Sequence, residues 1–345
     1  MANKGKHLIE NDYTPVTYDP QYILMVNHLK KYFPIKGGLL SQTVGHVKAV
    51  DGVTFNLRRG CTMGLVGESG CGKSTTGRTI LRLGGEKTGG QVLFNGKEVY
   101  DMTPAEMREL RTKMQIIFQD PYASLNPKKK VVQSVMTPLD VSGKYTKEEK
   151  LKKVIDILNE VGLSEKFLEK YPHEMSGGQR QRVVIARALI NDPELVICDE
   201  PVSALDVSVR SQVLNLLKDL QKERNLTYIF ISHDLSVVEY LCDRVAVMYL
   251  GRIMELADKK QLYGNPLHPY TRALLSAIPV PDIHAKKDEI ILQGEVPRPL
   301  NPPKGCLFST RCAYATERCH KEAPKLVELT DENGAKRSVS CFLYH

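Results

Sequence analysis

The stretch Gly67-Glu68-Ser69-Gly70-Cys71-Gly72-Lys73-Ser74 matches the pattern G-x-x-x-x-G-K-[ST]. Its glycines allow the backbone to turn successive N–H groups inward around phosphate oxygens, and a following helix adds its positive end. In this pattern the lysine pairs with the β- and γ-phosphates of a nucleotide, and the final hydroxyl binds Mg²⁺. The sequence therefore predicts a phosphate-binding loop, with Lys73 and Ser74 in these roles and Thr75 as a further contact.

The neighbours of this motif favour the same interpretation. An apolar run, Cys61 to Val66, precedes it and is typical of a buried strand, while Thr75 to Leu83 follows with helical character. A strand, a glycine-rich loop and a helix in succession are the context in which the pattern makes physical sense. A chance glycine-rich turn is the weaker interpretation.

A second short segment places two adjacent carboxylates at the end of an apolar run, Leu195 to Cys198. Ligands gather at the carboxyl ends of strands in open α/β sheets. Asp199 is therefore a candidate ligand of Mg²⁺, and Glu200 a candidate base that polarises an attacking water. On its own such a pattern is more often a solvated strand edge. Beside a phosphate-binding loop it is the expected metal and base pair. GTPases, nucleotide kinases, helicases and transporters all remain possible at this point.

The segment Met175-Ser176-Gly177-Gly178-Gln179 distinguishes among these classes of nucleotide-binding protein. Ser176 is a good helix N-cap, and the donors of Gly177 and Gly178 with the helix dipole form an anion site. The segment resembles the LSGGQ signature of the ABC ATPase family, with methionine in place of leucine. The family's other motif residues follow the expected order along the chain, namely Gln119, Asp199, Glu200, the run Ser203 to Asp206, and His233.

The resemblance to ABC ATP-binding subunits covers residues 22 to 265, and it implies roles for individual residues. Phe33, with Tyr32 as the alternative, takes the position that stacks on adenine. Gln119 would sense the nucleotide and join Ser74 and Asp199 around Mg²⁺, and His233 would contact the γ-phosphate. In this family the signature of one subunit faces the ATP on the phosphate loop of another. The implied set of contacts is Gly67 to Thr75, Ser176, Gly177, Gly178, Gln179, Asp199 and Asp206.

The pattern of elements predicts an α/β fold. Strand-like runs at Tyr228 to Ile231 and Val245 to Tyr249 alternate with helical patterns such as Gln179 to Ile190. With the resemblance, this indicates a P-loop NTPase of the ABC type with a mixed sheet core and a helical signature subdomain over about 120–185. We expect a flexible tail over 1–20, an ATPase domain over 21–264 and a small Cys-rich extension over 265–345, where prolines become frequent. A surface loop is predicted over 35–47.

The extension resembles that of ATP-binding subunits from oligopeptide and dipeptide importers. The segments that carry this likeness are Asn265 to Leu275 and Gly294 to Pro297, together with the cysteine spacing. The stretch Lys36 to Leu40 is similar to one of the two non-identical ATPases that pair in these importers. The resemblance thus implies a second, different ATPase as partner.

Four of the eight cysteines, Cys306, Cys312, Cys319 and Cys341, crowd into the last forty residues. Four thiolates suit either tetrahedral Zn²⁺ or an iron–sulfur cluster, and their spacing does not decide between the two. Four cysteines without a ligand are the least favoured interpretation, because this segment offers little apolar core in which to bury them. The resemblance to peptide importers implies a [4Fe–4S] cluster. His320 is a candidate substitute ligand, though a surface histidine fits it better.

The net charge and the lengths of the apolar runs indicate which partners and which cell compartment the chain favours. The chain of 345 residues carries a net charge of +8, without an Arg-rich arm, so a solvated surface fits better than a nucleic-acid partner. Its apolar runs are far shorter than the roughly 20 residues that span a bilayer, and the first twenty residues lack a secretory signal. We therefore expect a protein that stays in the cytosol, and the resemblance to importer subunits implies that it lies at the cytoplasmic face of the cell membrane.

The function expected from all these features is ATP hydrolysis coupled to peptide uptake. The implied partners are a second ATPase subunit, two transmembrane permease subunits and, indirectly, an extracytoplasmic peptide-binding protein. An importer of the same branch for nickel or a glycan fragment is the alternative, because an ATPase barely touches the solute. A soluble ABC ATPase in translation or DNA repair is less favoured, since neither a paired cassette nor a long coiled-coil insertion is seen.

Overall fold

The computed structural model describes residues 13–37, 42–278, 290–297, 300, 302–332 and 334–345. These residues divide into two compact units. The first unit contains residues 1–58, 63–101 and 232–345, and the second contains 59–62 and 102–231. The predicted boundary near residue 264 lies within the first unit and stays a prediction.

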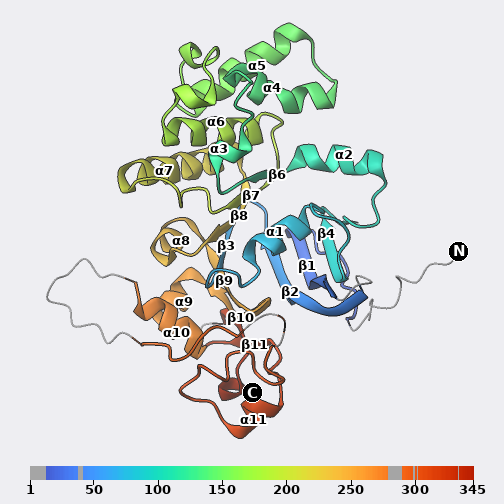
Figure 1. The fold of residues 1–345 in the computed structure, drawn as a ribbon, viewed down its shortest axis with the longest axis vertical. Coiled ribbons are helices and arrows are strands. Elements are labelled where there is room, and N and C mark those ends of the chain that lie inside the picture. Colours follow the sequence, from blue (N-terminus) through green and yellow to red (C-terminus); the bar gives the residue numbers. More distant parts are fainter. Residues whose placement is uncertain (1–12, 38–41, 279–289, 298–299, 301, 333) are drawn as a thin grey trace, which may run out of the picture. The chain divides into compact units, whose positions relative to one another are not determined.

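An antiparallel sheet in the first unit has the order β2-β1-β4-β5 (Figure 1). Its strands are β1 (Tyr22–Gly37), β2 (Gln42–Arg58), β4 (Gly89–Phe94) and β5 (Lys97–Glu98). The prediction of a loop over 35–47 was wrong, because Ile35 pairs with Gly45 and Lys36 with Thr43. Main-chain hydrogen bonds extend this exposed hairpin without the apolar run that would reveal a strand in the sequence. Residues 38–41, and with them most of the Lys36 to Leu40 stretch, lie outside the described residues.

A second set of strands in the same unit has the order β11-β12-β10-β9-β3. β3 (Thr62–Val66) and β9 (Arg244–Tyr249) are parallel, whereas β10 (Arg252–Asp258), β11 (Val327–Thr330) and β12 (Lys336–Val339) pair antiparallel. The mixed sheet that the sequence predicts is therefore present. The helices of this unit are α1 (Lys73–Ile80), α8 (Leu235–Leu241), α9 (Lys259–Gly264), α10 (Pro269–Ser276) and α11 (Glu317–Lys321).

A buried ion pair ties the C-terminal strands to β10. Glu255 is 0 % exposed, and its carboxylate accepts hydrogen bonds from Arg337 on β12 at 2.5 Å and from the N–H groups of Leu267 and His268 at 3.0 and 2.9 Å. A buried charge is tolerated only when such partners compensate it. The chain beyond α9 is thus anchored at one carboxylate. Nothing in the sequence predicted this pair, whose members are far apart along the chain.

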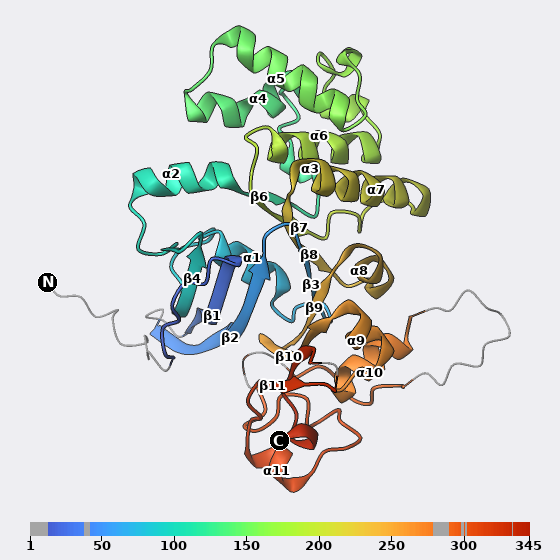
Figure 2. The same cartoon turned by 180° about the vertical axis from the view of Figure 1, so that it is seen from behind.

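The second unit has three parallel strands in the order β8-β7-β6, namely β8 (Thr227–Ser232), β7 (Leu195–Asp199) and β6 (Met114–Ile117). β7 and β8 are buried along their whole length, as the apolar runs predict. The helices are α2 (Pro104–Lys113), α3 (Pro121–Ser124), α4 (Val131–Ser142), α5 (Lys147–Glu160), α6 (Gly177–Leu189) and α7 (Val207–Arg224). Figures 1 and 2 both show α4, α5 and α6 packed together, and these three helices contact one another.

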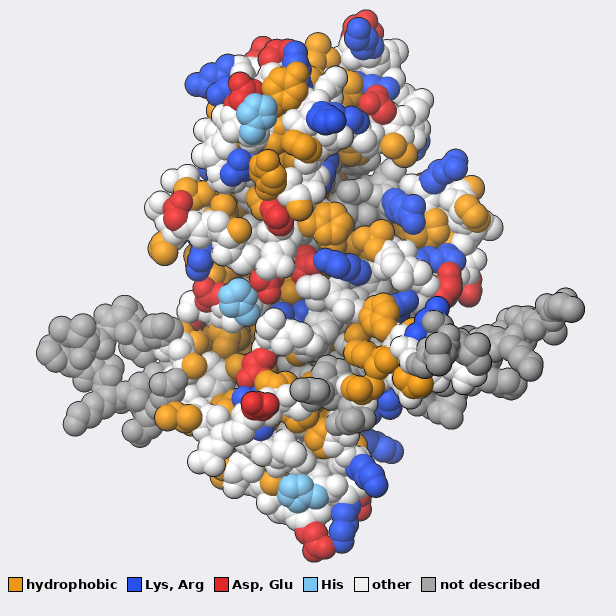
Figure 3. Space-filling view, viewed as in Figure 1, with side chains coloured by type: hydrophobic (Ala, Val, Ile, Leu, Met, Phe, Trp, Pro, Cys, Tyr) orange, Lys and Arg blue, Asp and Glu red, His pale blue; other side chains and the backbone are white. Residues whose placement is uncertain are grey.

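None of the helices within the described residues is long and apolar enough to cross a membrane. The face drawn in Figure 3 carries Lys and Arg side chains interspersed with Asp and Glu. A mixture of both signs is typical of a solvated surface. The net positive charge of the chain is therefore not gathered into one patch on this face.

Candidate nucleotide-binding site

The predicted phosphate loop lies between β3 and α1 in the first unit. Lys73, the first residue of α1, is 5 % exposed, and its Nζ donates hydrogen bonds to the carbonyl oxygens of Gly67 at 2.7 Å and Glu68 at 3.0 Å. The loop therefore wraps around its own lysine. This arrangement gathers backbone N–H groups and one ammonium at a helix N-terminus, which is a favourable place for phosphate oxygens.

Two glycines of the loop have no possible substitute. Gly67 has φ +146° and Gly72 has φ +106°, conformations that L side chains rarely adopt. A Cβ atom at Gly67 would collide with the carbonyl oxygen of Met248, and one at Gly72 with that of Ala49. The glycine pattern in the sequence thus reflects both the turn of the loop and its close approach to neighbouring backbone.

The two aromatic candidates on β1 differ in how their side chains are used. The Tyr32 hydroxyl donates a hydrogen bond to Asp51, and Lys48 Nζ lies 5.5 Å from the centre of the Tyr32 ring. Burial acts to raise the pKa of Asp51, but Arg252 and this hydroxyl outweigh it and leave the pKa lowered. Phe33 points to the other side of the strand and is 43 % exposed. Lys31 Nζ lies 5.3 Å from the centre of the Phe33 ring, so a cation lies near each of the two rings. Tyr32 is only partly exposed, and the greater exposure of Phe33 makes its ring the better candidate for stacking on a base.

The carboxylates and Gln119 lie together in the second unit. Asp199 ends β7 and is 1 % exposed, and Gln119 Nε2 donates to Glu200 Oε2 at 3.0 Å. Glu200 has φ +48°, which is uncommon for a non-glycine residue. Its N–H donates to the Ile231 carbonyl at 3.0 Å, and its carbonyl accepts from Ser203, so the strained backbone is held on both sides. Strain of this kind concentrates at functional sites.

The signature segment caps α6 as the sequence predicts. The Ser176 hydroxyl accepts from Gln179 N at 3.3 Å, and the Gln179 side chain accepts from Ser176 N at 3.0 Å, which is a complete capping box. Gly178 is buried against α7, where a Cβ atom would collide with Val209. Glycine at position 178 thus lets the start of α6 pack closely against the first turn of α7.

Asp206 and His233 occupy loop positions after β7 and β8. Asp206 is the N-cap of α7, and the hydrogen bond from Val209 N at 3.0 Å lowers the pKa of its carboxyl group. His233 is exposed and is the residue that follows β8 in the sequence. It belongs to the first unit. The candidate residues therefore form two sets, with the phosphate loop, Phe33 and His233 in the first unit and Gln119, Asp199, Glu200 and the signature in the second.

Two residues of the loop's surroundings were missed by the sequence reasoning. Tyr270 of α10 and Arg311 both contact Glu68, the second residue of the loop. They follow the loop by more than two hundred positions along the chain. No motif spacing could reveal such contacts, because they depend on how the C-terminal strands and loops fold back.

The four C-terminal cysteines line one cavity of about 160 Å³. Burial raises the pKa of the Cys306 thiol to about 11, and it also raises the pKa of Cys312 and Cys341. Over the part of the chain that the structure describes, no group of three or more His, Cys, Asp or Glu side chains is arranged to hold a metal ion. His320 is exposed and is not among the residues that line the cavity.

Comparison with known proteins identifies the family. The ABC transporter family model matches residues 50–203, and the model described as the C-terminal region of oligopeptide/dipeptide transporters matches 254–319. The oligopeptide transport ATP-binding protein AppF of Bacillus subtilis is 53% identical over 325 residues, which are 93% of this chain and 97% of that protein. The chain belongs to the ABC transporter ATP-binding proteins, in their oligopeptide and dipeptide branch.

Other relatives agree with this assignment. The dipeptide transport ATP-binding protein DppF of Haemophilus influenzae is 50% identical to this ABC ATPase, over 91% of the chain and 94% of that protein. Among solved structures, CbiO1 of Clostridium perfringens has a TM-score of 0.61 with 31% identity, covering 71% of this chain and 92% of its own. A dimer of the ATP-binding cassette MJ0796 with ADP and Pi has a TM-score of 0.60 with 29% identity, covering 68% and 98%.

Proposed function

We propose that this ABC ATPase is the ATP-hydrolysing subunit of an importer of dipeptides or oligopeptides. The observation that carries the proposal is the 53% identity to an oligopeptide transport ATP-binding protein over nearly the whole of both chains. The match of residues 254–319 to the oligopeptide/dipeptide transporter C-terminal region supports the same substrate class. Lys73, held inside a glycine loop at the start of α1, supplies the means of binding ATP.

In this proposal each candidate residue has one chemical task. The backbone N–H groups of Gly67 to Ser74 and the Lys73 ammonium bind the β- and γ-phosphates, and Phe33 stacks on the adenine. Ser74, Asp199 and Gln119 would hold Mg²⁺, which neutralises phosphate charge. Glu200 takes a proton from the attacking water, and His233 hydrogen-bonds the γ-phosphate. The bond between Gln119 and Glu200 supports a shared role for these two residues.

The signature segment is proposed to serve the nucleotide of a neighbouring subunit. Ser176, Gly177, Gly178 and Gln179 present donors at the N-terminus of α6, and Asp206 lies at the start of α7, where a second ATPase would pack. Binding of two ATP molecules would join the two subunits, and hydrolysis would release them. We propose that the partner is a second, non-identical ATPase.

The complex is proposed to lie at the cytoplasmic face of the cell membrane. There the two ATPases would bind two transmembrane permease subunits, which receive peptides from an extracytoplasmic binding protein. The ATPase domain would comprise 21–264 with its helical part over about 120–185, and 265–345 would form the C-terminal extension.

We propose that Cys306, Cys312, Cys319 and Cys341 hold a [4Fe–4S] cluster in the extension. The fit rests on one cavity lined by all four sulfur-bearing side chains. Zn²⁺ held by the same four thiolates is the alternative, and the resemblance to peptide-importer subunits favours the cluster. Bound iron would replace the thiol protons, which the neutral thiols of Cys306, Cys312 and Cys341 would release on binding. The role would be to stabilise the fold of the extension.

The proposal is tested by transport in a reconstituted complex. The chain is co-purified with its permease subunits and partner ATPase, placed in proteoliposomes and supplied with labelled dipeptides and oligopeptides. We expect ATP-dependent peptide uptake that is lost with Lys73→Ala. Uptake of nickel or a glycan in place of peptides would reject the substrate class, and a chain that binds no permease would reject the role as an importer subunit.

A further inference from the structure

Glu68 of the phosphate loop is held at three of its atoms or groups. Its carbonyl oxygen accepts from Lys73 Nζ at 3.0 Å, inside the loop itself. Its N–H donates to the Tyr270 hydroxyl at 3.0 Å. Its carboxylate accepts two hydrogen bonds from one nitrogen of Arg311, at 2.8 and 3.1 Å. Two of the three attachments therefore come from the C-terminal part of the chain rather than from the loop.

Tyr270 is fixed by packing before it reaches the loop. It is 0 % exposed in α10, and its ring centre lies 4.8 Å from that of Tyr249 and 5.3 Å from that of Phe308. Such an aromatic cluster leaves the side chain a single orientation. Burial raises the pKa of the Tyr270 hydroxyl, so it stays a neutral oxygen that can accept from an N–H group. Its hydroxyl is thus a fixed point for the backbone of the loop.

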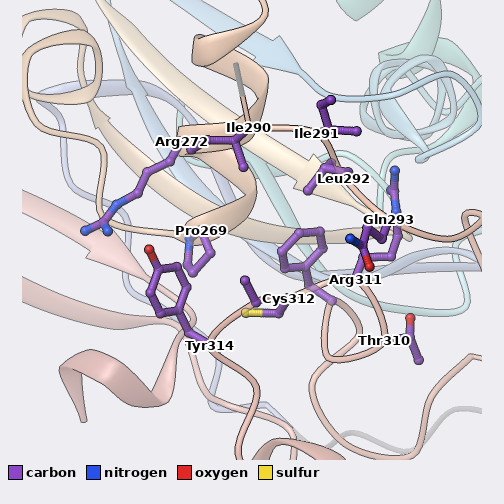
Figure 4. Close-up of a pocket in the computed structure, with 12 residues that line it drawn as sticks. Pro269, Arg272, Ile290, Ile291, Leu292, Gln293, Thr310, Arg311, Cys312 and Tyr314 are labelled. Atoms are coloured by element: carbon purple, nitrogen blue, oxygen red, sulfur yellow. The ribbon is translucent and has the colours of Figure 1, made fainter. Parts of the chain in front are cut away.

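Arg311 is equally constrained. The exposed fraction of its side chain is 8 %, and its guanidinium carbon lies 6.0 Å from the centre of the Tyr249 ring. Figure 4 shows Arg311 and Cys312 on the wall of a cavity of about 330 Å³, which Arg272 also lines. A buried guanidinium with one carboxylate partner forms a stronger hydrogen bond than an exposed pair does. Arg311 therefore fixes the Glu68 side chain.

These contacts bear on phosphate binding in two ways. A loop that is already held in its binding shape loses less conformational freedom when a ligand binds. A carboxylate in the loop would also repel a triphosphate, and Arg311 offsets that charge. We propose that Arg311 and Tyr270 are positioning residues of the phosphate loop, through which the C-terminal extension sets the affinity of this chain for ATP. The proposal rests on the proposed use of Gly67 to Ser74 as the nucleotide site.

The test compares nucleotide affinity among variants of the full chain. Arg311→Met keeps the aliphatic stem and removes the charge, and Tyr270→Phe removes only the hydroxyl. We expect the Kd for ATP with Mg²⁺ to rise about tenfold with Arg311→Met, equivalent to about 1.4 kcal/mol, and by a smaller factor with Tyr270→Phe. In the assembled complex KM should rise while kcat at saturating ATP changes less than about twofold, since the interaction is lost from ground state and transition state alike.

Three further variants separate positioning of the loop from general stabilisation of the fold. Arg272→Met is the matched control, because Arg272 lines the same cavity but bonds to Pro266 and Tyr344 rather than to the loop. It should lower the Tm and leave the Kd unchanged. In Arg311→Met/Glu68→Gln the unpaired carboxylate is gone, so this double variant should bind ATP more tightly than Arg311→Met alone. Arg311→Lys should restore part of the affinity.

The outcomes distinguish this inference from the proposed function. If Lys73→Ala weakens ATP binding but Arg311→Met, Arg311→Lys and Tyr270→Phe bind as the wild type does, the inference is overturned and the nucleotide site stands. Equal loss of affinity with Arg272→Met would also overturn it, since the effect would then be one of general stability. If the wild-type chain binds no ATP, or Lys73→Ala binds normally, the proposed function itself falls.

Discussion

Glu200 is the residue on which ATP turnover is expected to depend. Removing a general base slows a reaction by about 100- to 10,000-fold. Glu200→Gln should therefore abolish phosphate release by the assembled complex, whereas ATP binding is kept because the phosphate loop is untouched. Phosphate release and equilibrium ATP binding are measured on the same preparation. Full turnover by this variant would remove Glu200 from the role of base.

The choice between Phe33 and Tyr32 is also decided at the scale of single residues. Loss of stacking between a base and an aromatic ring costs about 1–3 kcal/mol. Phe33→Ala should thus weaken ATP binding about 5- to 150-fold. Tyr32→Phe is the matched control, since it removes the bond to Asp51 and keeps a ring in place. ATP titrations of both variants check this, with Tyr32→Ala as the third variant because it removes the other ring. A larger loss with Tyr32→Ala than with Phe33→Ala would reverse the assignment.

Local motifs were predictable because the residues that contact one another in them lie only a few positions apart along the chain. The capping box joins Ser176 to a residue three positions away, and the lysine of the loop bonds backbone five and six positions before it. The φ of +48° at Glu200 was not predictable. It depends on the Ile231 carbonyl of the next strand, so it emerges only once β7 and β8 are side by side.

At the scale of elements, β12 should depend on one ion pair with β10. Arg337→Met leaves Glu255 charged and buried, and breaking a buried pair on one side costs about 3–5 kcal/mol. We expect a fall of this size in the free energy of unfolding, measured by denaturant titration. Glu255→Gln/Arg337→Met should recover part of the loss, because no unpaired charge remains. Equal stability of the single variant and the wild type would show that the pair anchors nothing.

Strands and helices were predictable where burial leaves a periodic or continuous apolar pattern. The strand predicted at Tyr228 to Ile231 and the helix predicted over Gln179 to Ile190 were confirmed as β8 and α6, with ends shifted by one or two residues. The exposed end of the β1–β2 hairpin, residues 35–37 and 42–47, was missed because backbone pairing alone forms it. The short strands β11 and β12 lie among prolines and charges, and their place beside β10 has no local signal.

At the scale of the whole molecule, the extension should contain iron. A chain purified without air is expected to be brown and to contain about four iron atoms, and Cys319→Ser should lower both the iron content and the thermal stability. Iron analysis and the visible absorption spectrum check this, with Cys61→Ser, outside the cavity, as control. A colourless sample with one zinc ion per chain would replace the cluster by Zn²⁺, and a sample free of both metals would leave four structural thiols.

In the proposed complex this chain binds one ATP with its glycine loop and completes the ATP site of a neighbouring subunit with its signature. An experimental structure of the assembled complex with ATP, using Glu200→Gln to prevent hydrolysis, tests it most directly. We expect Ser176 and the N-terminus of α6 to face the γ-phosphate on the neighbour's loop. A structure in which that helix end faces solvent, with no nucleotide opposite it, would show that the two subunits do not share their ATP sites.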